Sequence, residues 1–357
     1  MKKHNFSAGP CILPDEVLKE SASSIINFNN LDLSLIEISH RSKPFIEVID
    51  EAKSLVRKIL NVPKNYSILF LQGGASLEFL MVPMNLMDIN GTAVYTNTGT
   101  WANKAIIEAK KLGNVNIIAN SSDKNYSYIP KDFIIPEDAN YFHCTSNNTI
   151  YGTQIKKFPK CKIPMVCDMS SDIFSRKIDI NKFDLIYAGA QKNMGPAGTT
   201  LVIVKDEILG KNNRDIPTML DYRTHINKES MFNTPPVFAI YVSMLTLRWL
   251  DKLGGIDTIE KRNIEKAKIL YKEIDRNELF VGTAEIEDRS NMNICFLLKE
   301  NKLEKKFNKM CDEKGISGII GHRSVGGYRA SIYNAMPIES VKELINLMKK
   351  LEDENIS

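Results

Sequence analysis

Short apolar runs alternate with amphipathic stretches between residues 65 and 205. The apolar runs have the length of buried strands and lie at residues 67–71, 92–96, 115–118, 141–144, 164–167 and 185–187. The stretches 76–87 and 101–112 repeat apolar positions near helical spacing. This alternation predicts an α/β fold with a mostly parallel central sheet covered by helices on both faces. A further run, 199–204, follows residue 187 too closely for a crossover helix, so we expect it to return antiparallel.

The pattern changes towards the carboxyl terminus. Residues 236–275 read as helix, broken at Gly254–Gly255, and strand, helix and strand patterns follow at 293–298, 302–314 and 328–333. A final helix has one apolar face, formed by Val341, Leu344, Ile345, Met348 and Leu351, and Pro337 suits its first turn. We therefore expect a large domain over residues 16–255 and a smaller α+β domain formed by residues 1–15 and 256–357.

Composition narrows the class of protein without identifying it. The 357 residues carry a net charge of +4, and the basic residues are scattered among acids, so no nucleic-acid surface is expected. No apolar run approaches 18 residues, and the amino terminus has no apolar signal core, so we expect neither membrane span nor secretion. The six cysteines form no CxxC pair and no metal-like cluster with histidine. We therefore expect a soluble, cytoplasmic protein with reduced cysteines and no metal site.

A lysine and an acid follow two of the expected strands. Asp168 comes directly after the run 164–167, and Lys192 lies in the sequence AGAQKNMGPAG at 188–198. Carboxyl ends of parallel strands form the active-site edge of such sheets. In a pyridoxal 5'-phosphate (PLP) enzyme a lysine forms a Schiff base with the cofactor aldehyde, and a carboxylate keeps the pyridine nitrogen protonated. Gln191 is a candidate hydrogen-bond donor to the cofactor phosphate. The simpler interpretation of the segment is a tight turn with a solvated lysine.

Two further segments suit the same cofactor. In LFLQGGASLEF (69–79) a strand, a glycine turn and a helix start follow one another, so the backbone N–H groups of Ala75 and Ser76 can bind a phosphate. Glycine turns before helices are common, so this signal is weak when taken alone. Trp101, at the start of the next helix, can stack on the cofactor ring, although a tryptophan at this position is more often a packing residue.

Three motifs carry polar groups with less specific patterns. FNTPP (232–236) places Asn233 and Thr234 before a helix, where N-capping is the simpler role. Two His-Arg pairs occur at 40–41 and 322–323, and a third arginine, Arg329, starts a strand. Arginine is the preferred partner of carboxylates and phosphates, so beside a PLP site these residues imply a substrate with two or three negative charges. Either pair alone would be read as solvated surface.

Taken together, the motifs resemble the phosphoserine aminotransferases, class V members of the fold type I PLP enzymes. The match runs almost end to end and rests on NFSAGP (5–10), SHRSK (39–43), LQGGAS (71–76), Trp101, NNTIYG (147–152), Asp168 with Ser170–Ser171, AGAQKNMGPAG, FNTPP and GHRSVGGYRASIYNAMP (321–337). The resemblance implies a Schiff base at Lys192, Asp168 at the pyridine nitrogen, Trp101 over the ring and Thr149 near the ring hydroxyl.

The resemblance also implies the remaining contacts. It places Gln191 and the Ala75–Ser76 turn at the cofactor phosphate, joined by Asn233 and Thr234 from a second subunit of a homodimer. Arg329 would bind the substrate α-carboxylate. The distal anion would be bound by His40, Arg41, His322 and Arg323. Some relatives carry an arginine where this chain has Ser76, so one positive charge in the substrate pocket is expected to be missing here.

The implied activity is the reversible transamination of 3-phosphohydroxypyruvate with L-glutamate to O-phospho-L-serine and 2-oxoglutarate, in serine biosynthesis. 4-Phosphohydroxythreonine is a further candidate product. The alternatives are another class V enzyme, such as a serine-type aminotransferase, a PLP lyase or a cysteine desulfurase, and a PLP-binding protein without catalysis. A desulfurase needs a cysteine on a loop near the site, and residues 315–330 contain none. A non-catalytic protein would be expected to lose Lys192 or Asp168.

Overall fold

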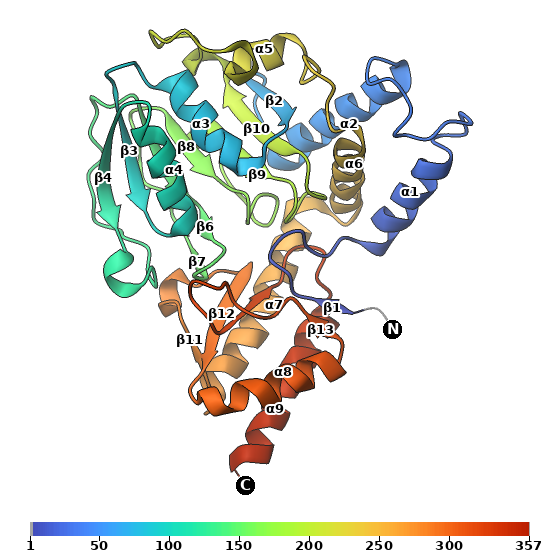
Figure 1. Ribbon diagram of the computed structural model, residues 1–357, viewed down its shortest axis with the longest axis vertical. Helices are drawn as coiled ribbons and strands as arrows, with labels where there is room; N and C mark the ends of the chain where they lie inside the picture. Colours follow the sequence, from blue (N-terminus) through green and yellow to red (C-terminus); the bar gives the residue numbers. More distant parts are fainter. Residues whose placement is uncertain (1–2, 357) are drawn as a thin grey trace.

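The computed structural model describes residues 3–356, which are built around a seven-stranded sheet (Figure 1). The strand order is β2-β10-β9-β8-β5-β3-β4, and only β10 runs antiparallel to its neighbours. The strands are β2 (Tyr66–Leu71), β3 (Thr92–Asn97), β4 (Asn114–Asn120), β5 (Tyr141–Thr145), β8 (Met165–Asp168), β9 (Leu185–Gly189) and β10 (Thr200–Lys205). The predicted α/β fold and the antiparallel return after β9 are confirmed.

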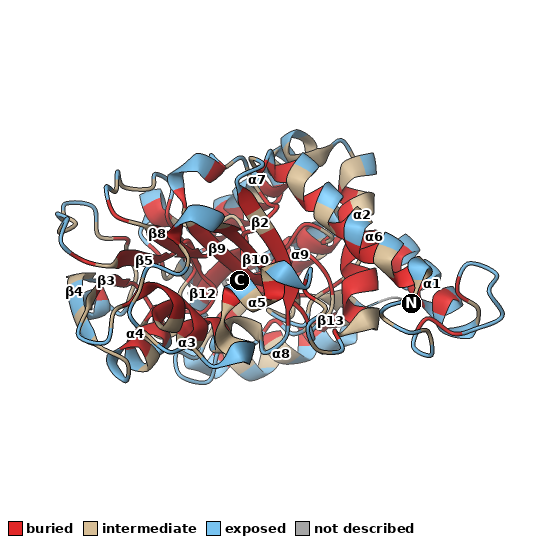
Figure 2. Cartoon of the chain, turned by 90° about the horizontal axis from the view of Figure 1, so that it is seen from above, coloured by how far each residue is buried: buried red, intermediate tan, exposed pale blue. Residues whose placement is uncertain are grey.

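Helices cover both faces of this sheet, as predicted (Figure 1). Successive residues of a strand point to opposite faces, so Leu69 packs with Phe79 in one core whereas Ile68 packs with Phe45 in another. The first face is covered by α3 (Gly74–Leu86), α4 (Thr100–Lys110) and α5 (Tyr222–Asn227). The second face is covered by α2 (Lys43–Leu60) and α6 (Val237–Lys252), with α1 (Asp15–Ile26) packed on α6. Burial on both sides explains why the central strands are apolar along their whole length (Figure 2).

The carboxyl-terminal third forms a second layer with its own core. Helix α7 (Gly255–Arg276) leads to an antiparallel sheet of β11 (Phe280–Gly282), β12 (Asn293–Leu298) and β14 (Tyr328–Ser331), covered by α8 (Glu304–Glu313) and α9 (Ile338–Ile356). The amino-terminal strand β1 (His4–Asn5) pairs in parallel with β13 (Ile316–Ser317), and Phe6 and Ile12 join this core. The segments at the two ends of the chain are thus neighbours, while the expected boundaries after residues 15 and 255 stay a prediction.

Several details differ from the sequence expectations. Helices α1 and α2 and the small hairpin β6 (Asn147–Asn148) with β7 (Thr153–Gln154) were not predicted. Pro337 precedes α9 and does not lie in its first turn, because the helix begins one residue later. The strand expected over 328–333 ends at Ser331, since the last residues enter a turn. In the described part of the chain, every helix is too short or too polar to cross a membrane.

Candidate active site

A cavity of about 320 Å³ opens at the carboxyl edge of the large sheet, where β5, β8 and β9 end; we call it the active-site cavity. Nine of the residues predicted for the site line it: Ala75, Ser76, Trp101, Thr149, Asp168, Gln191, Lys192, His322 and Arg329. Side chains at the carboxyl ends of adjacent parallel strands converge at one edge, which is why residues distant in the sequence meet here.

Lys192 places a buried amine in this cavity. Its Nζ donates a hydrogen bond of 2.9 Å to Oγ1 of Thr149. Burial lowers the pKa of Lys192 to about 8, and the positive charge of Arg329 acts in the same direction, while Asp168 opposes the shift. A substantial fraction of the amine is therefore neutral near physiological pH, as a nucleophile or a proton acceptor must be.

Asp168 is the acidic group of the cavity. It ends β8, is 5% exposed and accepts a hydrogen bond of 2.9 Å from the backbone N–H of Ser170. Burial raises the pKa of Asp168, and the charge of Lys192 and the Ser170 N–H oppose that shift. A carboxylate held in this way stabilises a cationic group that enters the cavity, because few other charges compete for it.

The turn before α3 forms an anion-binding wall. Gly73 and Gly74 adopt left-handed backbone angles (φ +89° and +64°), after which the first-turn N–H groups of Ala75 and Ser76 have no acceptor within the helix. A Cβ at Gly74 would meet no atom within 4 Å, so the approach to this turn is open.

The segment after β9 also contributes to the lining of this cavity. Gln191 lines the cavity, and a Cβ on Gly189 would lie 2.5 Å from Gln191 Oε1. Glycine at this position therefore makes room for the Gln191 side chain. The amide and the helix start together suit a phosphate group.

Arg329 and His322 come from the carboxyl-terminal layer. Arg329, on β14, makes no ion pair within residues 3–356, and its buried Nε has no hydrogen-bond partner there. His322 lies in an exposed turn, and its Nδ1 is 2.7 Å from Oγ of Ser324. Burial and the charge of Arg329 lower the pKa of His322. A guanidinium without a protein partner in a cavity is a ready site for a carboxylate.

The amino-terminal motif lines the cavity, although the sequence analysis assigned no role to it. Ala8 and Gly9 line the cavity, and a Cβ on Gly9 would lie 3.4 Å from Cγ of Lys192. Cys11 donates from Sγ to the backbone oxygen of Lys192 at 2.5 Å. Burial raises the pKa of Cys11 to about 12, against the opposing charge of Lys192, so this cysteine is a protonated thiol and no nucleophile.

Further lining residues were also missed as site residues: Gly74, Thr145, Asn147, Ile150, Ser170 and Ser171. Asn147 donates hydrogen bonds of 2.8 Å to Oγ of Ser171 and Oδ1 of Asn293. These contacts join the large sheet to β12 beneath the cavity. Several of these residues belong to motifs that were noted in the sequence, NNTIYG and Asp168 with Ser170–Ser171. Their roles were not predictable, because the residues of a buried hydrogen-bond network follow no regular spacing along the chain.

Five predicted residues lie outside the cavity of their own chain: His40, Arg41, Asn233, Thr234 and Arg323. Asn233 donates from Nδ2 to Oε1 of Gln72 at 3.1 Å, and Gln72 donates to the backbone oxygen of Thr234 at 3.0 Å. The N-cap of α6 is Pro236, so the N-capping interpretation of Asn233 and Thr234 is wrong.

Comparison with known proteins settles the family. The family model for class V aminotransferases matches residues 3–344. The chain belongs to the class V aminotransferases. This aminotransferase is 66% identical to the phosphoserine aminotransferase of Flavobacterium psychrophilum over 354 residues, which is 99% of each chain.

Solved structures agree. The phosphoserine aminotransferase of Bacillus circulans subsp. alkalophilus superposes with a TM-score of 0.96 at 42% identity, covering 99% of both chains. The PLP-bound phosphoserine aminotransferase of Trichomonas vaginalis gives 0.93 at 38% identity, covering 98% of this chain and 100% of that one. The resemblance inferred from the motifs, the fold type I architecture and the assignment as a PLP-dependent aminotransferase are confirmed.

The chemical groups that line the active-site cavity match those of PLP. PLP carries a phosphate, an aldehyde and a basic ring nitrogen, and the cavity offers an open helix start, a partly neutral lysine and a buried carboxylate. Trp101 adds a ring whose Nε1 has no hydrogen-bond partner among residues 3–356. Lys104 Nζ lies 4.5 Å from the centre of that ring.

Proposed function

We propose that this aminotransferase interconverts 3-phosphohydroxypyruvate plus L-glutamate with O-phospho-L-serine plus 2-oxoglutarate, in serine biosynthesis. The observation that carries the proposal is the placement of Lys192 and the unpaired Arg329 in one cavity with His322. The names and high identity of the relatives support the choice of substrate. 4-Phosphohydroxythreonine, with the same pair of anionic groups, is a second proposed product.

The proposed mechanism uses the groups of the chain as follows. When bound, PLP supplies an electron sink that stabilises negative charge at the substrate α-carbon. Arg329 binds the α-carboxylate and so orients the α-carbon towards Lys192. The Lys192 amine takes the proton from that carbon in the first half-reaction and delivers a proton to the corresponding carbon of the incoming oxo acid in the second, a role that suits its pKa of about 8. Asp168 supplies the negative charge that holds the cofactor ring nitrogen protonated.

The distal anion is proposed to bind the two His-Arg pairs. Ser76 lines the cavity with a short neutral side chain, so no positive charge comes from that position. Recognition of the phosphate therefore depends on His40, Arg41, His322 and Arg323. Both substrates carry an α-carboxylate and a distal anion, so one pocket serves the two half-reactions.

A homodimer with shared active sites is proposed to complete this pocket. The segment before His40 exposes Ile26, Leu33 and Ile36 to 82%, 51% and 62%, although a solvated surface rarely clusters such side chains. A partner that covers them would bring His40 and Arg41 close to the other subunit's cavity. Asn233 and Thr234 are proposed to reach the partner's cofactor phosphate.

A heterodimer test separates shared from independent sites. Subunits carrying Lys192→Ala and Arg41→Ala, with different affinity tags, are purified as a mixed dimer. If Arg41 serves the partner's cavity, one cavity is intact and about half of the activity with phosphoserine returns, because the dimer is two-fold. If Arg41 serves its own cavity, both sites are damaged and no activity returns.

The substrate proposal is tested on the holoenzyme. L-Glutamate should shift the absorbance band of the bound cofactor, and 3-phosphohydroxypyruvate should restore it. Hydroxypyruvate, which lacks only the phosphate, is the matched control and should restore it far more slowly. Equal rates with the two oxo acids would refute phosphate recognition while leaving the aminotransferase assignment intact.

We also propose the two-domain division at residues 15 and 255 and a cytoplasmic location. Separate apolar cores in the sheet layer and the carboxyl-terminal layer support the division. The six cysteines are all free, which is usual in a reducing compartment and supports the location.

A further inference from the structure

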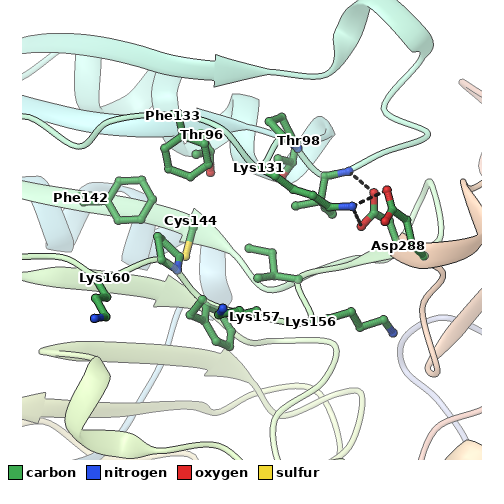
Figure 3. Close-up of a pocket in the computed structure, with 16 residues that line it drawn as sticks. Thr96, Thr98, Lys131, Phe133, Phe142, Cys144, Lys156, Lys157, Lys160 and Asp288 are labelled. Atoms are coloured by element: carbon green, nitrogen blue, oxygen red, sulfur yellow. Dashed lines mark hydrogen bonds and ion pairs between the residues drawn. The ribbon is translucent and has the colours of Figure 1, made fainter.

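A second and larger cavity, of about 590 Å³, lies apart from the active-site cavity on the face of the sheet that carries α2 and α6. We call it the junction cavity (Figure 3). Its floor is formed by Thr96 of β3 and by Phe142 and Cys144 of β5. No lining residue is shared with the active-site cavity. Its volume lies within the range of small-molecule sites, roughly 300–1,000 Å³.

The cavity exists because an irregular segment replaces a helix. The connection from β4 to β5, residues 121–140, contains only a short 3-10 turn, although parallel strands are usually joined by a helix. This segment and residues 155–160 arch over the sheet and leave space beneath them. Glu287 and Asp288 from the carboxyl-terminal layer close one end, where Lys131 forms ion pairs with both.

The walls of the junction cavity are apolar and aromatic. Ile129, Phe133, Phe142, Ile155 and Phe158 line it. Phe142 is fully buried, and Phe133 and Phe158 are partly exposed. Aromatic surface of this kind favours a ligand with a flat or branched apolar body.

One polar atom at the floor lacks a partner. Thr96 is 3% exposed, and its Oγ1 forms no hydrogen bond within residues 3–356. Thr96 and Phe133 both line the cavity (Figure 3). A buried hydroxyl without a partner costs stability, so a ligand group that bonds to it gains an interaction that the protein alone does not make.

The mouth of the cavity is basic. The charged residues that line the cavity are four lysines, Lys131, Lys156, Lys157 and Lys160, and two carboxylates, Glu287 and Asp288. Lys156 is held by Oε1 of Gln154 at 2.8 Å, and Lys131 is held by its ion pairs. Lys157 and Lys160 are exposed and form no ion pair or side-chain hydrogen bond within residues 3–356. Two free positive charges therefore flank an apolar chamber.

We propose that the junction cavity is a second ligand site, which binds an organic anion with an aromatic or branched apolar body. The body occupies the chamber between Phe133, Phe142 and Phe158, and the carboxylate or phosphate lies at the mouth between Lys157 and Lys160. The anionic group adds affinity because these lysines have no competing partner.

The test uses 3-phenylpropanoate as the probe and 3-phenylpropan-1-ol as its neutral match, titrated calorimetrically into the holoenzyme. The anion should bind about tenfold more tightly than the alcohol. Lys157→Glu with Lys160→Glu should remove this preference and leave the alcohol unaffected. Lys110→Glu with Lys182→Glu makes the same charge change at exposed positions outside the cavity and should alter neither Kd.

Two further arms keep the result unambiguous. If the variant with Lys157→Glu and Lys160→Glu does not fold, Lys157→Gln with Lys160→Gln is used in its place. This neutral variant should weaken the binding of 3-phenylpropanoate by a smaller factor. Arg329→Gln removes the carboxylate site of the active-site cavity and should leave the Kd of 3-phenylpropanoate unchanged. The proposal is overturned if the alcohol binds as well as the anion, if the lysine variants bind the anion normally, or if Arg329→Gln abolishes binding.

Discussion

The active-site cavity and the junction cavity begin from consecutive residues of one strand. Cys144 of β5 faces the junction cavity, and Thr145 faces the active site. The junction cavity is the larger, at about 590 Å³ against 320 Å³, yet its walls are mainly apolar, and its two carboxylates are paired with Lys131 at one end. The active-site cavity concentrates Asp168, Lys192 and Arg329 in a smaller space.

We therefore base the proposed catalytic centre on the convergence of charged groups and not on cavity volume. Burial lowers the pKa of Lys192 and raises that of Asp168, and each group limits the shift of the other. Such opposed shifts are typical of sites that must transfer protons. If the comparison is right, equivalent substitutions in the two cavities must have unequal effects.

The largest difference is expected between two lysines. Lys192→Ala should lower the rate of transamination by about 10²–10⁴-fold or more, because a positioned proton-transfer group usually contributes a factor in that range. Lys160→Ala, at the mouth of the junction cavity, should leave kcat/KM within about twofold, because surface changes are usually mild. Steady-state rates with phosphoserine measure both. A comparable loss from Lys160→Ala would mean that the two cavities act as one site.

A smaller effect is expected for Arg329, which is proposed to bind the substrate α-carboxylate and not to transfer protons. Arg329→Gln should cost on the order of 2–5 kcal/mol, or tens to thousands fold in kcat/KM, for every amino-acid substrate, since all carry an α-carboxylate. Arg41→Ala should instead damage phosphoserine turnover far more than turnover of alanine. Equal losses with both substrates in Arg41→Ala would show that this arginine is structural.

The sequence predicted the chemistry better than the surroundings. Asp168 and Lys192, which line one cavity, were singled out because the apolar runs before them are recognisable as strands. Ala8, Gly9 and Asn147 were not assigned a role, because their position depends on the pairing of β1 with β13 and on a buried amide network. Long-range pairing of this kind leaves no local pattern.

Helices and cavities were predictable to different degrees. The apolar face of α9 was predicted correctly, and Val341, Leu344 and Leu351 are buried. Helix α2 was missed despite its apolar face, and the junction cavity could not be foreseen, because it is formed by irregular segments without periodicity. His40 and Arg41, which the family resemblance assigned to the substrate pocket, do not line the cavity of their own chain, and their role stays a prediction.

Two threonines provide a closer pair for comparison. Thr149→Val removes the acceptor of the Lys192 hydrogen bond and should lower kcat/KM by about tenfold, as expected for a bond to a charged group. Thr96→Val removes a hydroxyl that has no partner within residues 3–356, so activity should not change. The free energy of unfolding should stay the same or rise by up to about 1 kcal/mol in Thr96→Val. Denaturant titration of both variants tests this, and a clear destabilisation by Thr96→Val would contradict it.

The smallest expected effect is a shift in the titration of Lys192. In the cofactor-free protein the pKa of Lys192 is lowered to about 8, first by burial and then by Arg329, so its amine is protonated and unreactive below that pH and reactive above it. Reductive methylation with formaldehyde, read by mass spectrometry at this lysine across pH 6–10, should be half-maximal near pH 8. Arg329→Gln removes a positive charge and must move the midpoint upwards, whereas Asp168→Asn removes a negative charge and must move it downwards. Lys157→Gln with Lys160→Gln removes two positive charges at the junction cavity and should leave the midpoint in place. A midpoint that follows the junction variants, or ignores Arg329 and Asp168, would show that the charges near Lys192 do not set its protonation.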